Sequence, residues 1–246
     1  MPSIIWGRHP QEAHENPYEY EGQNQFIREA SATLVKLNGL LDKYAMQFHS
    51  NDESLEKACW MLTIDLLDSL SESLKLLEEK RHRVAFRLFR DAVETMDLLK
   101  VLYAENNMSV EALSKWYKNN TIRHIDSRKY IEETFGKDVA DKRETYYKEI
   151  SKFTHRTYRA LLKSFSLGRG NMLVHDSHNK SGLLVLPHTI AYGYAILADL
   201  IIQTIECLSM SSILNAKEVN SALLTSLETK TIPRRFEPNR HFKSSN

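Results

Sequence analysis

Five charged residues recur at helical spacing within a segment that is otherwise strongly apolar. This charged strip consists of Arg83, Arg87, Arg90, Asp91 and Glu94. Around a helix that turns 100° per residue, its arginines and its glutamate lie between about −20° and +40°, with the aspartate near 80°. The apolar residues that cover most of the remaining circumference are Val84, Phe86, Leu88, Phe89, Ala92, Val93, Met96, Leu99 and Leu102. Because one neighbouring helix does not cover an arc this wide, we expect a central helix whose charged strip lines a polar seam.

Arginines in such a seam need carboxylate partners or an anionic ligand, because an unpaired buried charge is costly. The last long apolar segment offers a polar line that could supply partners: Asp199, Gln203 and Glu206. The alternative is that Arg87 with Asp91, and Arg90 with Glu94, are ordinary i,i+4 ion pairs on an exposed helix. The charged strip is therefore a candidate binding site, and the sequence leaves open whether it binds a ligand or only fixes the packing.

A second segment, from Arg143 to Phe165, combines an apolar face with hydroxyl, imidazole and basic groups. Ser151 and His155 lie on the flank of the apolar face. Further round, basic residues recur at i, i+4, i+8, i+11 and i+15, and this basic stripe consists of Lys148, Lys152, Arg156, Arg159 and Lys163. On one continuous helix the stripe could lie against a phosphate backbone, which makes nucleic acid a candidate partner. The alternative is a solvated face, which charged helices commonly have.

Histidines in and after the non-helical segment 166–182 raise the question of a metal site. His175 and His178 are separated by two residues, and His188 follows, a spacing that could hold zinc. The chain, however, carries 10 scattered histidines. It also has no Walker loop, dinucleotide-binding glycine pattern or nucleophile elbow. We therefore predict no metal and no cofactor.

Length and composition favour a soluble globular protein with one sizeable core. The chain has 246 residues, of which 42% are hydrophobic, and a formal net charge of +1, so any electrostatic attraction must be local. Cys59 and Cys207 lie far apart on apolar segments and are expected to be buried free thiols. The first residues lack a basic start followed by an apolar run, and the apolar stretch 190–205 is short for a membrane span. We expect a cytoplasmic protein without membrane contact.

The scarcity of chain breakers predicts an all-α fold, a multi-helix bundle of about six or seven helices. We expect helices at about 24–48, 53–79, 81–105, 109–135 with a break near 119–120, 138–166, 187–213 and 216–227, and one short extended segment near 183–186. Ser50, Asn51 and Asp52 suit a cap before the second helix, and Ser109 suits a cap before the fourth. The predicted organisation is an N-terminal strap at 1–23, a helical domain at 24–228 and a basic C-terminal tail at 229–246.

Three parts of the chain resemble a group of uncharacterised all-helical bacterial proteins. They are RVAFRLFRDAVETMDLL, then YYKEISKFTHRT, and then a loop with an LLVLP run before an apolar helix. In that group an arginine and a glutamate on a central helix accompany a serine and a histidine on a later one. The residues that the resemblance implicates here are Arg87 or Arg90, Glu94, Ser151 and His155.

A further pattern, Arg169 followed after five residues by His175, is similar to the signature of HEPN-type helical proteins, many of which are RNA-cleaving toxins or defence effectors. The resemblance implies metal-independent RNA cleavage, with His175 as general acid or base and Arg169 stabilising the phosphoryl charge. A ribonuclease of this kind could use His155 in place of His175.

Two function hypotheses follow. The first is a cytoplasmic helical binding or interaction protein that acts with a partner protein or as a homo-oligomer. The resemblance alone suggests a setting for it, as an accessory or effector component of a bacterial stress or phage-defence system. The second hypothesis is a HEPN-like ribonuclease.

Overall fold

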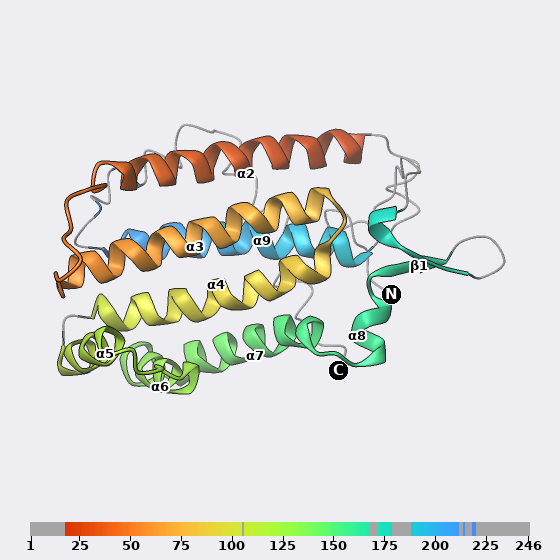
Figure 1. The fold of residues 1–246 in the computed structure, drawn as a ribbon. Helices are drawn as coiled ribbons and strands as arrows, with labels where there is room; N and C mark the ends of the chain where they lie inside the picture. The colour runs from red at the N-terminus through yellow and green to blue at the C-terminus, as the bar shows by residue number, and fades with distance from the viewer. Residues whose placement is uncertain are drawn as a thin grey trace.

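The computed structural model describes residues 18–104, 106–167, 172–178 and 188–211, together with residues 214, 218 and 219. This part of the chain is an all-α bundle with a small hairpin at one end, so the predicted fold class is confirmed (Figure 1). Its helices are α2 (Tyr18–Asp42), α3 (Leu55–Glu78), α4 (His82–Leu102), α5 (Asn107–Tyr117), α6 (His124–Phe135), α7 (Lys137–Thr154), α8 (Tyr158–Leu162) and α9 (His188–Leu208). The antiparallel strands are β1 (Phe165–Leu167) and β2 (Leu173–His175). The predicted extended segment 183–186, most of the predicted helix 216–227 and the basic tail 229–246 lie outside the described residues.

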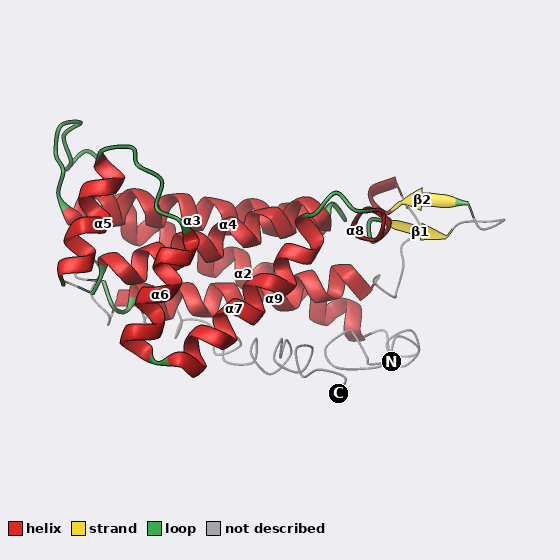
Figure 2. Ribbon diagram, turned by 90° about the horizontal axis from the view of Figure 1, so that it is seen from below, coloured by secondary structure: helices red, strands yellow, loops and turns green. Residues whose placement is uncertain are grey.

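Helix α4 lies at the centre of the bundle, as its wide apolar arc predicts. It packs against α3 on one side and α7 on the other, and also contacts α9, α6 and α5. Figure 1 shows α2 as the outermost layer, next to α3, with α7 on the opposite side of α4. Phe86, Phe89 and Met96 on α4 are fully buried. Figure 2 shows α8 and the hairpin together at one end of the bundle, at the end of α4 where its charged strip begins.

The prediction of one helix over 138–166 is wrong, because α7 ends at Thr154. His155 and Thr157 are extended, with ψ values of 151° and 154°. The Thr157 hydroxyl accepts a hydrogen bond from Ala160 N at 3.4 Å and caps α8. The His155 carbonyl oxygen accepts from Arg83 Nη2 at 2.9 Å, so a side chain of α4 binds it where the helix stops. No glycine or proline marks this break in the sequence.

Other helix ends also differ from the predicted ones. Helix α2 ends at Asp42, before a turn in which Met46 has a positive φ of 63°. Ser54, rather than a residue of 50–52, caps α3 by accepting from Lys57 N at 3.3 Å, and Asp52 in turn accepts from Ser54.

The predicted break near residues 119–120 is confirmed, because α5 ends at Tyr117 and α6 begins at His124. Helix α5 starts differently from the prediction. Asn106 is the N-cap, and Ser109 is its reciprocal partner in a capping box rather than the cap itself.

Candidate anion-binding site

The charged strip of α4 faces α7 across an antiparallel helix pair. The Phe86 and Phe153 rings stack with their centroids 4.0 Å apart and hold the two helices together. Tyr147 contacts Glu94 near one end of the strip, and the His155 carbonyl contacts Arg83 at the other. The seam predicted for α4 therefore has α7 as its opposite wall.

The acidic end of the seam is internally neutralised. Glu94 Oε1 accepts hydrogen bonds from Arg90 Nε at 2.9 Å and from the Tyr147 hydroxyl at 2.6 Å. The Arg90 guanidinium also lies 5.1 Å from the Tyr147 ring centroid, in a cation–π contact. Burial and the hydrogen bond to Glu94 raise the pKa of Tyr147, so its hydroxyl stays protonated and remains a donor. Arg90 and Glu94 therefore form an ordinary i,i+4 ion pair, as the alternative interpretation of the charged strip predicts.

The other end of the seam carries positive charge without a neutralising partner. Arg83 and Arg87 are one helical turn apart on α4, and Arg156 follows the His155 carbonyl to which Arg83 binds. We call Arg83, Arg87 and Arg156 the arginine cluster. Burial lowers the pKa of Arg83, and the charges of Arg87 and Arg156 lower it further. Within the described part of the chain, none of the three arginines has a carboxylate in an ion pair.

Two polar atoms along the seam are buried without a hydrogen-bond partner among the described residues. They are Arg83 Nε and Ser151 Oγ. Ser151 lies one turn after Tyr147 and one turn before His155 on α7, so the antiparallel register places it opposite the part of α4 between Arg83 and Glu94. A guanidinium donor and a hydroxyl that can donate or accept are therefore both unused in the seam.

The structure joins Asp199 and Gln203 to a different arginine from those of the charged strip. Gln203 Oε1 accepts a short hydrogen bond from Arg143 Nη1, and its amide donates to Asp199. Burial raises the pKa of Asp199. Glu206 is exposed. The interpretation of this polar line as partner of the charged strip is therefore wrong, since Asp199 and Gln203 belong to the network around Arg143.

Arg143 forms a buried ion pair that sequence reasoning missed. Its Nε donates to Asp97 Oδ1 at 2.7 Å, and His124 Nε2 donates to Asp97 Oδ2 at 2.7 Å. Asp97 is 0% exposed and Arg143 is 8% exposed. Burial opposes ionisation of Asp97, but Arg143 and His124 outweigh it and lower its pKa. The sequence carried one signal of this pair: Asp97 is an acid among the apolar residues of α4, and Arg143 is a base among the buried residues of α7.

The predicted basic stripe does not form one continuous helix face. Its five members lie on α7, in the connection to α8, on α8 and directly after it, because the helix ends at Thr154. Lys148 and Lys152 pair with Glu144 and Glu149, one turn away on α7. Lys163 Nζ lies 3.8 Å from the Phe153 ring centroid, and burial lowers its pKa.

The other two members of the stripe are exposed. Arg156 and Arg159 have no ion pair within the described residues. Three members of the stripe therefore have no ion pair within the described residues: Arg156 before α8, Arg159 on α8 and Lys163 directly after it, close to the arginine cluster.

The hairpin holds the predicted His175 and docks on α4 through His82. His82 is buried, its Nε2 donates to the Lys163 carbonyl at 2.7 Å, and it lies 3.7 Å from Asp176 Oδ2. His175 Nδ1 accepts from Ser177 N at 3.3 Å, and the His175 and His178 ring centroids are 5.6 Å apart. Arg169 lies outside the described residues.

His155 and His175 belong to different elements, the end of α7 and strand β2. In the described part of the chain, no three His, Cys, Asp or Glu side chains are grouped so that they could hold a metal ion.

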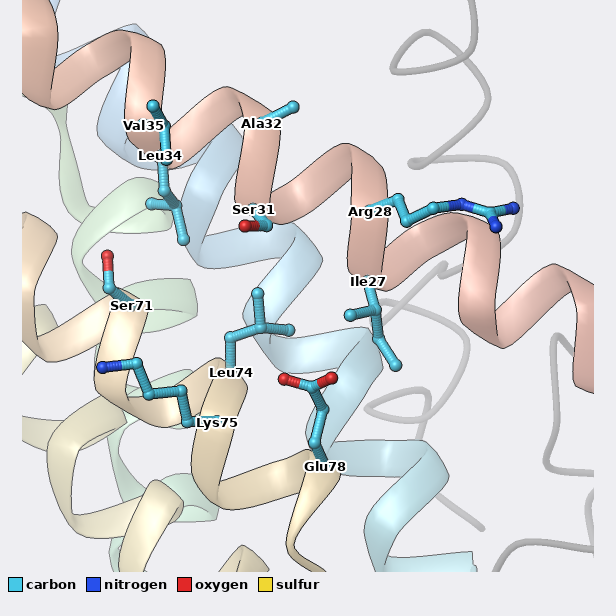
Figure 3. A pocket seen from close by; sticks show the side chains of 10 residues that line it. All are labelled: Ile27, Arg28, Ser31, Ala32, Leu34, Val35, Ser71, Leu74, Lys75 and Glu78. Carbon is cyan, nitrogen blue, oxygen red and sulfur yellow. The ribbon is translucent and has the colours of Figure 1, made fainter.

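Two grooves lie away from the charged strip. One, of about 540 Å³, lies between α2 and α3, and Figure 3 shows Ile27, Leu34 and Leu74 pointing into it while the Arg28 guanidinium points away from α3. The other, of about 340 Å³, lies between α6 and α7, where Arg128 is paired with Glu144 at 3.2 Å. Neither presents a group of unpaired like charges, so the arginine cluster remains the strongest candidate site.

Comparison of the chain with family models, with curated proteins and with solved structures found no match. Among the described residues, no helix has both the length and the apolarity that crossing a membrane requires. The protein is an all-α bundle with a cationic seam between α4, α7 and the start of α8. Any function must therefore be inferred from the residues of that seam.

Proposed function

We propose that this protein is a binding protein and that its arginine cluster holds a phosphate-bearing ligand. One observation supports the proposal above the others. Arg83, Arg87 and Arg156 converge from two segments without a carboxylate partner in the described chain, and Arg83 Nε is buried without an acceptor. Three mutually repelling guanidinium groups are stabilised when an anion lies between them.

The position of Arg83 strengthens the proposal. It lies in the first turn of α4, where the helix dipole disfavours cations and favours anions. That turn contains no acidic residue, and the N-cap residue Arg81 makes no side-chain capping hydrogen bond. An anion bound here would interact favourably with both the dipole and the guanidinium groups.

Phosphate is the anion that fits these donors best. A guanidinium group is planar and always charged, and it offers paired N–H donors that match two phosphate oxygens. Ser151 adds a hydroxyl, which can donate to a third oxygen. A single carboxylate would leave more of these donors unused.

Calorimetric titration with inorganic pyrophosphate tests the proposal. We expect Arg87→Ala to weaken binding by about 10- to 100-fold, the range of a lost charged hydrogen bond. Arg28→Ala on α2 is the matched control, because it removes the same charge from an exposed site away from the seam. Equal losses in the two variants, or no binding by the wild type, would contradict the proposal. Circular dichroism checks that both variants fold.

A cytoplasmic location is part of the same proposal. Cys59 and Cys207 are both buried free thiols, the state expected in a reducing compartment. Association with a partner protein or with a second copy of the chain, and a setting in bacterial stress or phage defence, stay predictions. The defence setting has support only from the resemblance.

RNA cleavage is a second candidate, favoured by two neighbouring imidazoles, His175 at the end of β2 and His178 in the turn that follows it. The His178 ring centroid lies 5.6 Å from that of His175, close enough for the two imidazoles to serve as complementary acid and base. Incubation with labelled RNA under a chelator tests this function in the wild type, His155→Ala and His175→Ala. Cleavage that both substitutions leave intact, or no cleavage at all, would remove it.

A further inference from the structure

Exposed apolar side chains gather at the end of the bundle that carries the arginine cluster. Tyr158 on α8 is 73% exposed, and Leu161, Phe165, Met172 and Leu173 are also exposed. These residues belong to α8 and the hairpin, which lie together at one end of the bundle (Figure 2). Exposed apolar groups clustered beside unpaired positive charge are typical of a binding surface rather than of a plain solvated one.

Tyr158 is an aromatic residue with most of its side chain exposed, and it lies between two arginines without an ion pair in the described residues. Arg156 precedes it by two residues and Arg159 follows it directly, and both are exposed. Two residues span at most about 7 Å of chain, so a phosphate held by Arg156 would bring its own nucleotide within reach of the Tyr158 ring.

The backbone that carries the Tyr158 ring is fixed by a helix cap. Thr157 caps α8 through its hydrogen bond to Ala160 N, and Tyr158 is the first residue of that helix. A tyrosine on a capped helix has few torsion angles to immobilise, so stacking on it costs little conformational entropy.

We propose that the ligand of the arginine cluster is a single strand of nucleic acid, with a base stacked on Tyr158. The inference rests on the proposed function, since the phosphates of the strand would occupy the arginine cluster. Proteins that bind single strands combine a positive groove along the backbone with aromatic rings on which bases stack. Arg83, Arg87, Arg156 and Arg159 supply the charge, and Tyr158 supplies the ring.

A duplex fits this surface less well than a single strand. In a duplex the bases already stack on one another, so an exposed ring gains nothing from them unless the helix opens. The formal net charge of +1 adds no long-range attraction for the dense charge of a duplex. Binding therefore depends on local contacts, and a strand with accessible bases makes the most of them.

Fluorescence anisotropy with four labelled probes of the same length tests the inference. They are single-stranded RNA, single-stranded DNA, the corresponding DNA duplex, and an abasic DNA strand that keeps the phosphates and lacks the bases, each of about 12 nucleotides. We expect the base-bearing single strands to bind tighter than the abasic strand by about 5- to 100-fold, the range for one stacked base. A preference for RNA or for DNA identifies the source of the strand.

Variants separate the stacking contact from the phosphate contacts. Tyr158→Ala should lose the advantage of the base-bearing strands and leave the abasic strand unaffected, whereas Tyr158→Phe should bind like the wild type. Arg87→Ala should weaken binding of every probe, and Arg28→Ala of none. If the abasic strand binds as tightly as the others, if Tyr158→Ala changes nothing, or if the duplex binds best, this inference fails while the proposed function stands. If the wild type binds none of the four probes, this inference also fails, and if Arg87→Ala binds every probe and pyrophosphate like the wild type, the proposed function itself fails.

Discussion

The Arg143 guanidinium on α7 donates from Nε to Oδ1 of Asp97 on α4 at 2.7 Å and makes a buried ion pair between the two central helices. The same helix pair carries the arginine cluster at its other end. Asp97 and Arg143 at one end of the α4–α7 interface are therefore paired with each other, whereas Arg83, Arg87 and Arg156 at the other end have no carboxylate partner among the described residues. This contrast distinguishes a structural role for Asp97 and Arg143 from a binding role for the arginine cluster.

Asp97→Asn should lower the free energy of unfolding by about 3 kcal/mol, because it leaves the buried charge of Arg143 uncompensated. Glu94→Gln makes the same chemical change in a half-exposed pair and should cost about 1 kcal/mol or less. Urea denaturation measures both values. A cost for Asp97→Asn no larger than that for Glu94→Gln would argue against the structural role of the buried pair.

The thermal stability of the protein should fall as the pH drops below about 6.5. Burial of His82 lowers its pKa below the ordinary value of 6.5, so the unfolded chain binds this proton first as the pH falls. Asp97 also has a lowered pKa, but its stabilising effect is lost only at still lower pH. The pH ranges over which His82 and Asp97 change the stability are therefore separate. Melting temperatures measured between pH 8 and pH 5 report the loss of stability that protonation of His82 causes.

His82→Gln should flatten this pH dependence, since glutamine can still donate to the Lys163 carbonyl and does not titrate. The matched control is His178→Gln, which makes the same substitution at an exposed position after β2. Its melting temperature should depend on pH as that of the wild type does. An unchanged slope in His82→Gln would show that another group is responsible.

Pyrophosphate should raise the melting temperature of the wild type, because a ligand that binds only the folded state stabilises it. At a hundredfold excess over Kd the stabilisation is about 2.7 kcal/mol. Arg87→Ala should show a much smaller rise at the same concentration, and Arg28→Ala the full rise. Differential scanning fluorimetry with sodium chloride at matched ionic strength excludes a general salt effect, and equal rises in all three proteins would speak against a specific site.

Cys59 and Cys207 should resist thiol reagents in the folded protein. Burial raises the pKa of each to about 12, so neither forms appreciable thiolate at pH 8. Reaction with Ellman's reagent should release almost no chromophore until urea unfolds the chain, when both thiols react. Rapid labelling of the native protein would contradict the burial of the two side chains.

Much of this architecture could be predicted from local sequence patterns. The wide apolar arc of α4 predicts its central place, and the spacing of Arg90 and Glu94 predicts their ion pair. The end of α7 could not be predicted in this way. At that end the His155 carbonyl accepts a hydrogen bond from Arg83, a residue 72 positions away in the chain. Because a broken helix and a continuous one have the same basic spacing, the sequence alone suggested an unbroken stripe.

The pairing of Asp97 with Arg143 was hidden for a similar reason. Asp97 is a single acid among apolar residues of α4, whereas Arg143 lies within a run of charged residues, and their separation of 46 residues gives no periodic signal. The sequence analysis instead offered Asp199 and Gln203 as partners of the charged strip. Polar residues on a core helix do not indicate which neighbouring helix they face. Only the packing of α4, α7 and α9 decides the partner.

The most direct measurement of the central claim is the NMR signal of the Arg83 Nε–H group during titration with pyrophosphate. This donor is buried without an acceptor among the described residues, so a bound phosphate should shift its resonance, which Arg83→Lys assigns by removing it. The Nε–H signal of Arg143, already bonded to Asp97, should stay in place and serves as the internal reference. A saturable shift of Arg83 with Arg143 unmoved is the predicted result, and an Arg83 signal that does not respond to pyrophosphate would contradict an anion site at the arginine cluster.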